Sequence, residues 1–149
     1  MPRQSSSIPT EVELEILHVL WQQGGPSTVR QIYKKISQQK NTAFSTTLRM
    51  VQVMIEKGLL LKDENAKPQI FWPAKPREQT QLQLVDHLIQ KGFGGSALTL
   101  VLSAAAAQRI TTQELDQVRE LIDKTKAGQQ THVAQGQSKR GHQAKRGKK

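Results

Sequence analysis

Residues 45–72, STTLRMVQVMIEKGLLLKDENAKPQIFW, combine one amphipathic segment with two short strand-like runs. The first part has a helical period up to Lys57, and Gly58 follows where a helix commonly ends in a left-handed backbone. Residues 59–62 and 69–72 are rich in large apolar side chains and enclose a polar, turn-prone sequence. The stretch therefore predicts a helix that leads directly into a β-hairpin.

Two more helices are predicted upstream of this stretch. Two residue pairs have the spacing of a capping box, in which side chains satisfy free backbone N–H groups at a helix start: Thr10 with Glu13 and Thr28 with Gln31. They predict helices over residues 11–23 and 29–39, separated by the helix-breaking sequence Gly24-Gly25-Pro26. Three helices followed by a hairpin is the element order of a winged helix-turn-helix.

Downstream of the hairpin, Pro73 and Pro76 mark a boundary, because proline lacks a backbone donor and keeps its predecessor out of the helical region. Residues 77–127 then contain three short apolar helical segments that a lone chain would not leave in water. We expect these segments to form a dimer interface. Its predicted contacts are Leu82, Val85, Ile89, Phe93, Leu100, Val101, Leu115, Val118 and Ile122.

The predicted fold is mainly α-helical with one small β-hairpin. It consists of a winged-helix DNA-binding domain over residues 8–75 and a helical dimerisation domain over residues 76–127. Residues 128–149 contain six basic residues, no acidic residue and few apolar ones. Such a segment cannot offset the entropy of ordering, so we expect a disordered basic tail. The formal charge of +10 for the whole chain favours a polyanionic partner.

Several classes of protein are disfavoured by what the sequence lacks. No cysteine is present, so neither a disulfide framework nor a thiolate metal site is available. The four histidines are scattered, and no phosphate-binding loop, nucleophile elbow or evident carboxylate pair occurs. We expect no enzyme, no metal and no cofactor. The absence of an apolar span and of a secretory signal predicts a cytoplasmic protein.

The amphipathic segment that starts near Ser45 has two chemically different faces at about 100° per residue. One face is predicted to join the core: Thr47, Met50, Val51 and Met54. The other is polar and has a suitable width for a major groove: Ser45, Thr46, Arg49 and Gln52. Arginine pairs with guanine and glutamine with adenine at their major-groove edges. The alternative is an ordinary solvated helix face.

Four basic residues are candidates for contacts with DNA phosphates. Arg30 and Lys34 lie on the predicted second helix, and Lys62 and Lys67 flank the turn of the hairpin. Such contacts add affinity but carry little sequence information. For the hairpin, a solvated tip is the alternative interpretation.

The order and spacing of several segments resemble the penicillinase-repressor family over roughly residues 8–124. The likeness is carried by TEVELEIL at residues 10–17, LW at 20–21, TVRQI at 28–32, STTL at 45–48, EKGLL at 56–60, FGGS at 93–96 and LV at 100–101. The resemblance implies a homodimeric winged-helix repressor of a palindromic operator. It also implies a partner system with a membrane-bound sensor protease, whose action leads to cleavage of the repressor.

The sequence departs from that family pattern in three places. The copper-responsive branch has a C-terminal cysteine cluster, which this chain lacks. The asparagine-phenylalanine cleavage pair of the antibiotic-responsive branch is replaced by Ser103-Ala104, the candidate cleavage region here. The basic tail after Ala127 extends the usual ending of the family.

Two other functions are compatible with parts of this sequence. A winged helix with a basic tail also suits a non-specific architectural DNA-binding protein of linker-histone-like design, which binds by charge and shape. Such a protein has no need for the apolar module between reader and tail. A protein-interaction module is the third alternative.

Overall fold

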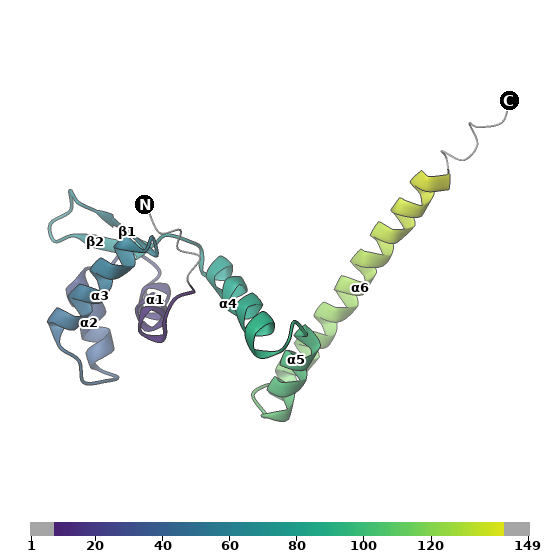
Figure 1. Ribbon diagram of the computed structural model, residues 1–149, viewed down its shortest axis with the longest axis horizontal. Coiled ribbons are helices and arrows are strands. Elements are labelled where there is room, and N and C mark those ends of the chain that lie inside the picture. Colours follow the sequence, from purple (N-terminus) through teal and green to yellow (C-terminus); the bar gives the residue numbers. More distant parts are fainter. Residues whose placement is uncertain (1–7, 142–149) are drawn as a thin grey trace. The chain divides into compact units, whose positions relative to one another are not determined.

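The computed structural model describes residues 8–141, with side-chain burial for residues 8–129. The described elements follow the order of a winged helix and three further helices (Figure 1): α1 Glu11–Gln23, α2 Val29–Ser37, α3 Phe44–Glu56, β1 Leu60–Asp63, β2 Ile70–Pro73, α4 Arg77–Gly92, α5 Ala97–Ala106 and α6 Thr112–Gly141. The chain divides into two compact units, one ending at Ser96 and one starting at Ala97. The element types and their order confirm the predicted fold class.

Two capping boxes set the starts of α1 and α2. The Thr10 hydroxyl accepts from the Glu13 N–H at 3.3 Å, and the Glu13 carboxylate accepts from the Thr10 N–H at 3.4 Å. Thr28 and Gln31 repeat this exchange at 3.2 and 2.9 Å. Gly24 ends α1 with a φ of 70°, a left-handed conformation that glycine adopts without steric cost. Both predicted helices are present, although α2 is shorter than predicted.

The strands β1 and β2 form an antiparallel hairpin, the wing, in which Leu60 pairs with Pro73. A third segment is attached to this sheet by an isolated bridge at Ser27. The Ser27 N–H donates to the Phe71 carbonyl at 3.0 Å, and the Phe71 N–H donates to the Ser27 carbonyl at 2.9 Å. Because Ser27 lies between α1 and α2, this bridge holds the wing against the helices.

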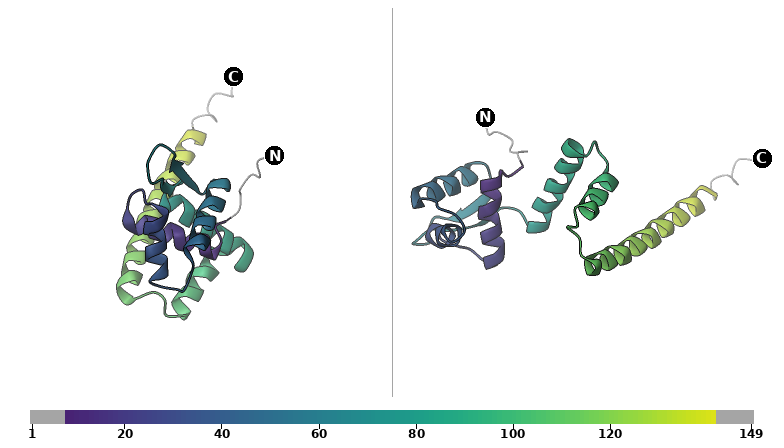
Figure 2. Two further views of the ribbon diagram at one scale, coloured as in Figure 1. Left: turned by 90° about the vertical axis from the view of Figure 1, so that its left-hand side faces the viewer. Right: turned by 90° about the horizontal axis from the view of Figure 1, so that it is seen from below.

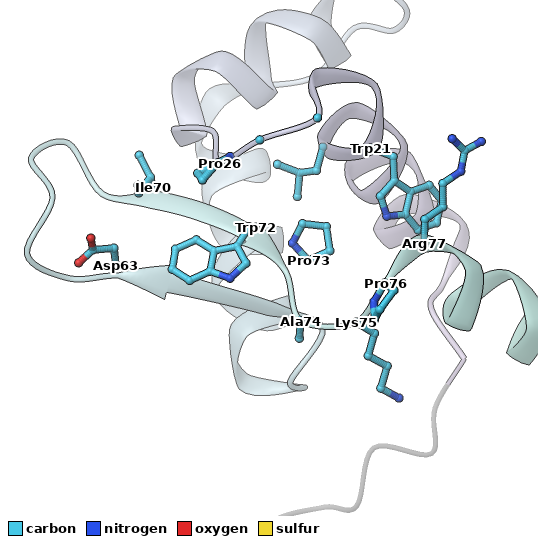
Figure 3. Close-up of a pocket in the computed structure, with 13 residues that line it drawn as sticks. Trp21, Pro26, Asp63, Ile70, Trp72, Pro73, Ala74, Lys75, Pro76 and Arg77 are labelled. Carbon is cyan, nitrogen blue, oxygen red and sulfur yellow. The ribbon is translucent and has the colours of Figure 1, made fainter.

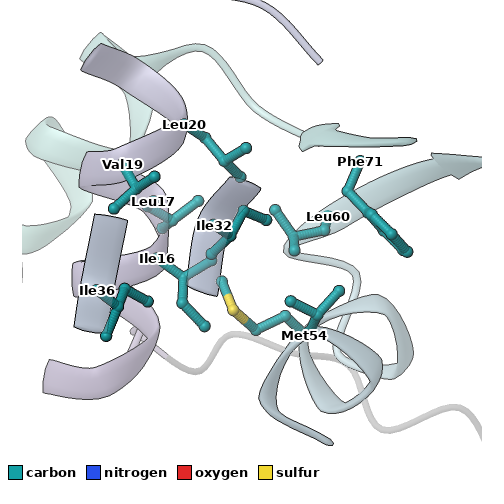
Figure 4. Packing of buried hydrophobic residues seen from close by; sticks show 10 residues of the cluster. Ile16, Leu17, Val19, Leu20, Ile32, Ile36, Met54, Leu60 and Phe71 are labelled. Atoms are coloured by element: carbon teal, nitrogen blue, oxygen red, sulfur yellow. The ribbon is translucent and has the colours of Figure 1, made fainter. Parts of the chain in front are cut away.

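The apolar core of the first unit lies between α1, α2, α3 and the wing (Figure 4). Its buried members are Ile16, Leu17, Val19, Leu20, Ile32, Ile36, Val51, Met54, Leu60 and Phe71. The four α1 residues recur at helical spacing, as an amphipathic helix requires. Full burial of a side chain of this size contributes about 1.5–3 kcal/mol. The core therefore holds α3 firmly in place.

One ion pair connects the start of α1 to the end of α3. The Nζ of Lys57 lies 2.7 Å from the Oε1 of Glu13, whose side chain is 1% exposed. The second carboxylate oxygen, Oε2, is buried and has no hydrogen-bond partner among the described residues. Lys57 is therefore the main compensation for a carboxylate that has been removed from water.

Replacing Lys57 by methionine is expected to destabilise the first unit by about 2 kcal/mol, because Glu13 would stay buried without its cation. This value is below the range of about 3–5 kcal/mol for a fully buried pair, because the Lys57 side chain is 36% exposed and solvent screens part of the interaction. Urea denaturation of the purified variant measures the change.

Lys40→Met is the matched control for this experiment. Lys40 pairs with Glu15 at 2.8 Å, but both side chains are more than one third exposed. Its loss should change the free energy of unfolding by under about 0.5 kcal/mol. The double variant Glu13→Gln with Lys57→Met should recover part of the stability, and equal effects of Lys57→Met and Lys40→Met would contradict the assignment.

The boundary between the two units differs from the prediction at residues 75 and 76. The first unit continues through α4 to Ser96. The start of α4 packs near α1, because the Arg77 guanidinium lies 5.7 Å from the centre of the Trp21 ring and Thr80 is buried. These contacts join residues far apart in sequence. The boundary was predicted from the two prolines, which carry no information about such contacts.

In the second unit, a short turn connects α5 to the long helix α6 (Figure 2). The start of α6 has the predicted cap, in which the Thr111 hydroxyl accepts from the Glu114 N–H at 3.1 Å. The predicted end of this helix was wrong, because α6 runs to Gly141 instead of stopping at Ala127. Glutamine, lysine and alanine around this point favour a helix, and no proline stops it. Residues 142–149 of the predicted disordered tail lie outside the described residues.

None of the described helices is both long and apolar enough to cross a membrane.

Candidate nucleic-acid interface

The helix α3 separates its two faces as predicted. Its buried residues are Thr47, Val51 and Met54, with Met50 half-buried. All four residues of the predicted polar face are exposed: Ser45, Thr46, Arg49 and Gln52. These four side chains therefore form one accessible polar strip on a helix that the core fixes in place. We call this strip the reading face.

An aromatic cluster lies where α2 meets the start of α3. The Tyr33 and Phe44 rings stand edge to face with centres 5.5 Å apart. The Arg30 guanidinium lies 5.3 Å from the centre of the Phe44 ring. A cation in this position is attracted to the face of the ring, so Phe44 restrains the Arg30 side chain. Arg30 and Lys34 are both exposed on α2, and Arg30 contacts the start of α3 through Phe44.

Phe44 and Tyr33 were not among the predicted site residues. Phe44 is an isolated aromatic residue just before the predicted helix. This position is the only feature of the sequence that indicates a role for it. Its contact with Arg30 joins two helices, and spacing along the chain does not reveal such a contact. Ala43 at the start of α3 provides no side-chain cap, in contrast to the threonines of α1 and α2.

The two basic residues of the wing have different surroundings. Lys62 on β1 forms an ion pair with Glu64 at 3.2 Å. Lys67 is exposed in the turn between the strands and has no ion-pair partner among the described residues. A phosphate would have to compete with Glu64 for Lys62, whereas Lys67 is available.

The predicted dimerisation residues are spread over α4, α5, α6 and the residue after α4. Five of them are between 44% and 70% exposed: Leu82, Val85, Val101, Leu115 and Ile122. The other four are half-buried: Ile89, Phe93, Leu100 and Val118. The helix α5 has a strongly apolar sequence yet no buried residue. The single chain therefore leaves apolar surface uncovered on these helices.

A winged helix whose third helix presents arginine, glutamine and hydroxyl side chains belongs to the class of DNA-binding transcription regulators. No group of His, Asp or Glu suited to a metal ion occurs in the described part of the chain. The family model of the penicillinase repressor matches residues 9–124. The chain belongs to this family of transcriptional repressors.

Two relatives come from strains of Mycobacterium tuberculosis, CDC 1551 / Oshkosh and H37Rv. Each is described as the transcriptional regulator BlaI and is 25% identical over 119 residues. The match covers 79% of this chain and 85% of the relative. The relatives are regulators of transcription, in agreement with the expectation of a non-enzymatic protein.

Proposed function

We propose that this repressor binds a palindromic operator as a homodimer, with α3 of each protomer in a major groove. The observation that carries the proposal is the reading face, where four predicted contact residues are exposed together on a helix held by the core. An α-helix fits the major groove, where each base pair presents a distinct set of donors and acceptors. Arg49 and Gln52 are the residues that can distinguish bases.

The remaining contacts are proposed to position the reader on the DNA backbone. Arg30, Lys34 and Lys67 are exposed cations that can neutralise phosphates without reading sequence. Lys62 contributes once it exchanges Glu64 for a phosphate. The basic residues after Ala127 are proposed to add further non-specific affinity by neutralising phosphates.

The homodimer is proposed from the uncovered apolar surface of α4, α5 and α6. Leu82, Leu98 and Leu121 are each more than 60% exposed in the single chain. Apolar surface of this extent is typical of an interface, and a second copy would cover it. Two linked readers make the second half-site contact intramolecular, which raises apparent affinity by roughly 10²–10⁴.

Release from the operator is proposed to follow proteolysis within α5. Ser103 and Ala104 lie inside this helix, with Ser103 exposed in the single chain. A helix must open locally before a protease can cut it, and α5 would be protected in the dimer. Cleavage would separate α6 from the reader and dissolve the interface. A sensor protease system at the membrane is the proposed source of the cut.

Competition binding at moderate salt tests the proposal against the architectural alternative. The probe is DNA from the region upstream of the gene, narrowed by footprinting, and the competitor is random-sequence DNA. A repressor should prefer its site by about 10³-fold or more. Equal binding to both would favour an architectural protein, and binding to neither would favour a protein-interaction module.

Phe44→Leu is expected to weaken binding to operator and random DNA alike, by about 0.5–1 kcal/mol. Leucine preserves apolar volume but removes the ring that restrains Arg30. A double-mutant cycle with Arg30→Gln, measured by fluorescence anisotropy, checks the mechanism. The two losses should be less than additive because they remove the same contact. Fully additive losses would show that Phe44 does not act through Arg30.

A further inference from the structure

We propose that a pocket between α1, the wing and the connection to α4 binds a small aromatic carboxylate. The pocket measures about 780 Å³ and is open to solvent. We call it the two-tryptophan pocket. Its main lining residues are shown in Figure 3: Trp21, Pro26, Trp72, Pro73, Lys75 and Arg77. Its volume is within the range of about 300–1,000 Å³ that is typical of small-molecule sites.

The walls are suited to a flat apolar group. Trp72 on β2 and Trp21 on α1 lie on either side of Pro73 (Figure 3). Both indoles are only half-buried, so each leaves apolar surface open to the pocket. Aromatic rings bind against such surfaces by offset stacking or edge contacts. Neither tryptophan belongs to the proposed DNA interface.

The charges at one end of the pocket favour an anion. Lys75 and Arg77 both line the pocket, and neither has an ion-pair partner within the described residues. Asp63 is at the other end, beyond Trp72 in Figure 3. Its carboxylate accepts from the Asn65 N–H at 2.9 Å, so it is occupied within its own turn. The Lys75 and Arg77 side chains extend in different directions (Figure 3), so a ligand carboxylate would be held by one of them while the other adds to the positive potential.

A second observation concerns Trp21. Its Nε1 is shielded from solvent and has no acceptor among the described residues. Buried polar groups are nearly always hydrogen-bonded, so this unpaired donor favours an oxygen acceptor, which can reach it from the pocket once a neighbouring side chain moves aside. The Arg77 guanidinium lies over the same ring at 5.7 Å from its centre and is exposed enough to move. One carboxylate can thus bind Arg77 and approach the indole N–H.

The two tryptophans are the only ones in the chain, so intrinsic tryptophan emission reports on this pocket alone. The full-length protein is titrated with 4-phenylbutyrate, without DNA, and the emission maximum is followed. We expect a blue shift that saturates, because the ligand displaces water from both indoles. The neutral 4-phenylbutan-1-ol and the cationic 4-phenylbutylamine should each bind at least about tenfold more weakly.

Variants locate the site and test the role of charge. Lys75→Gln combined with Arg77→Gln should weaken 4-phenylbutyrate binding about tenfold while leaving the alcohol unchanged. Lys91→Gln, at an exposed position on α4 outside the pocket, is the matched control and should have no effect. Trp72→Phe and Trp21→Phe assign the shift to each indole, and circular dichroism verifies that every variant is folded.

Four results would overturn the proposal. The first is the absence of a saturable shift, and the second is equal binding of the acid, the alcohol and the amine. The third is an emission maximum that shifts when the concentration of the ligand-free protein is raised, which would mean that a second copy covers the pocket. The fourth is displacement of 4-phenylbutyrate by random-sequence DNA, which would assign Lys75 and Arg77 to phosphates. The test is independent of the proposed DNA function because it contains no DNA in its primary arm.

Discussion

A fragment that ends at Leu102 is expected to be monomeric and to bind a two-half-site operator roughly 10²–10⁴ times more weakly than the intact chain. The cut removes the end of α5 and all of α6. The apolar residues of α6 include Val118, Leu121 and Ile122. The winged helix should stay folded, since its core consists only of residues from α1, α2, α3 and the wing. Sedimentation gives the mass, and gel shifts give the affinity.

Two controls separate loss of the dimer from loss of folding. The fragment should bind DNA with a single half-site as tightly as the intact protein does, because the reading face is unchanged. In the full-length chain, Val101→Asp places a charge on exposed apolar surface of α5 and should reproduce the loss on the two-half-site operator. A fragment that remained dimeric and bound this operator with full affinity would refute the proposed interface and release mechanism.

Arg49→Ala is expected to lower operator affinity by about 1–3 kcal/mol and to relax the preference at one base position in each half-site. Arg49 is exposed in the middle of the reading face and forms no ion pair with the described residues. Its guanidinium is therefore free to donate two hydrogen bonds to one guanine. Gel shifts over a set of operators with single base changes measure both effects.

Arg30→Gln is the comparison for Arg49→Ala, since each removes the charge of one exposed arginine. The loss at Arg30 should be equal on operator and random DNA and should reduce the salt dependence by about one phosphate contact. If Arg49→Ala behaved in the same way, Arg49 would be a phosphate contact, and base reading would have to come from other residues of α3.

The sequence by itself determined the order of the elements and the faces of the reader helix. Capping boxes, Gly24 and the helical spacing within α3 are local signals, because each depends on residues within one or two turns. These signals predicted the bounds of α1 and the buried position of Thr47 correctly. They did not locate the end of α6, because Gly128 follows Ala127 where a glycine commonly ends a helix, yet the helix continues through it.

Only the tertiary structure decided which distant residues meet. The Glu13–Lys57 ion pair joins residues 44 positions apart, and the Ser27–Phe71 bridge attaches the wing to the helices. The contact between Arg30 and Phe44, like the two-tryptophan pocket, arises in the same way from elements packed on a common core. Periodicity reveals which face of a helix is buried but not the partner that covers it, because that choice depends on how the helices and wing pack together.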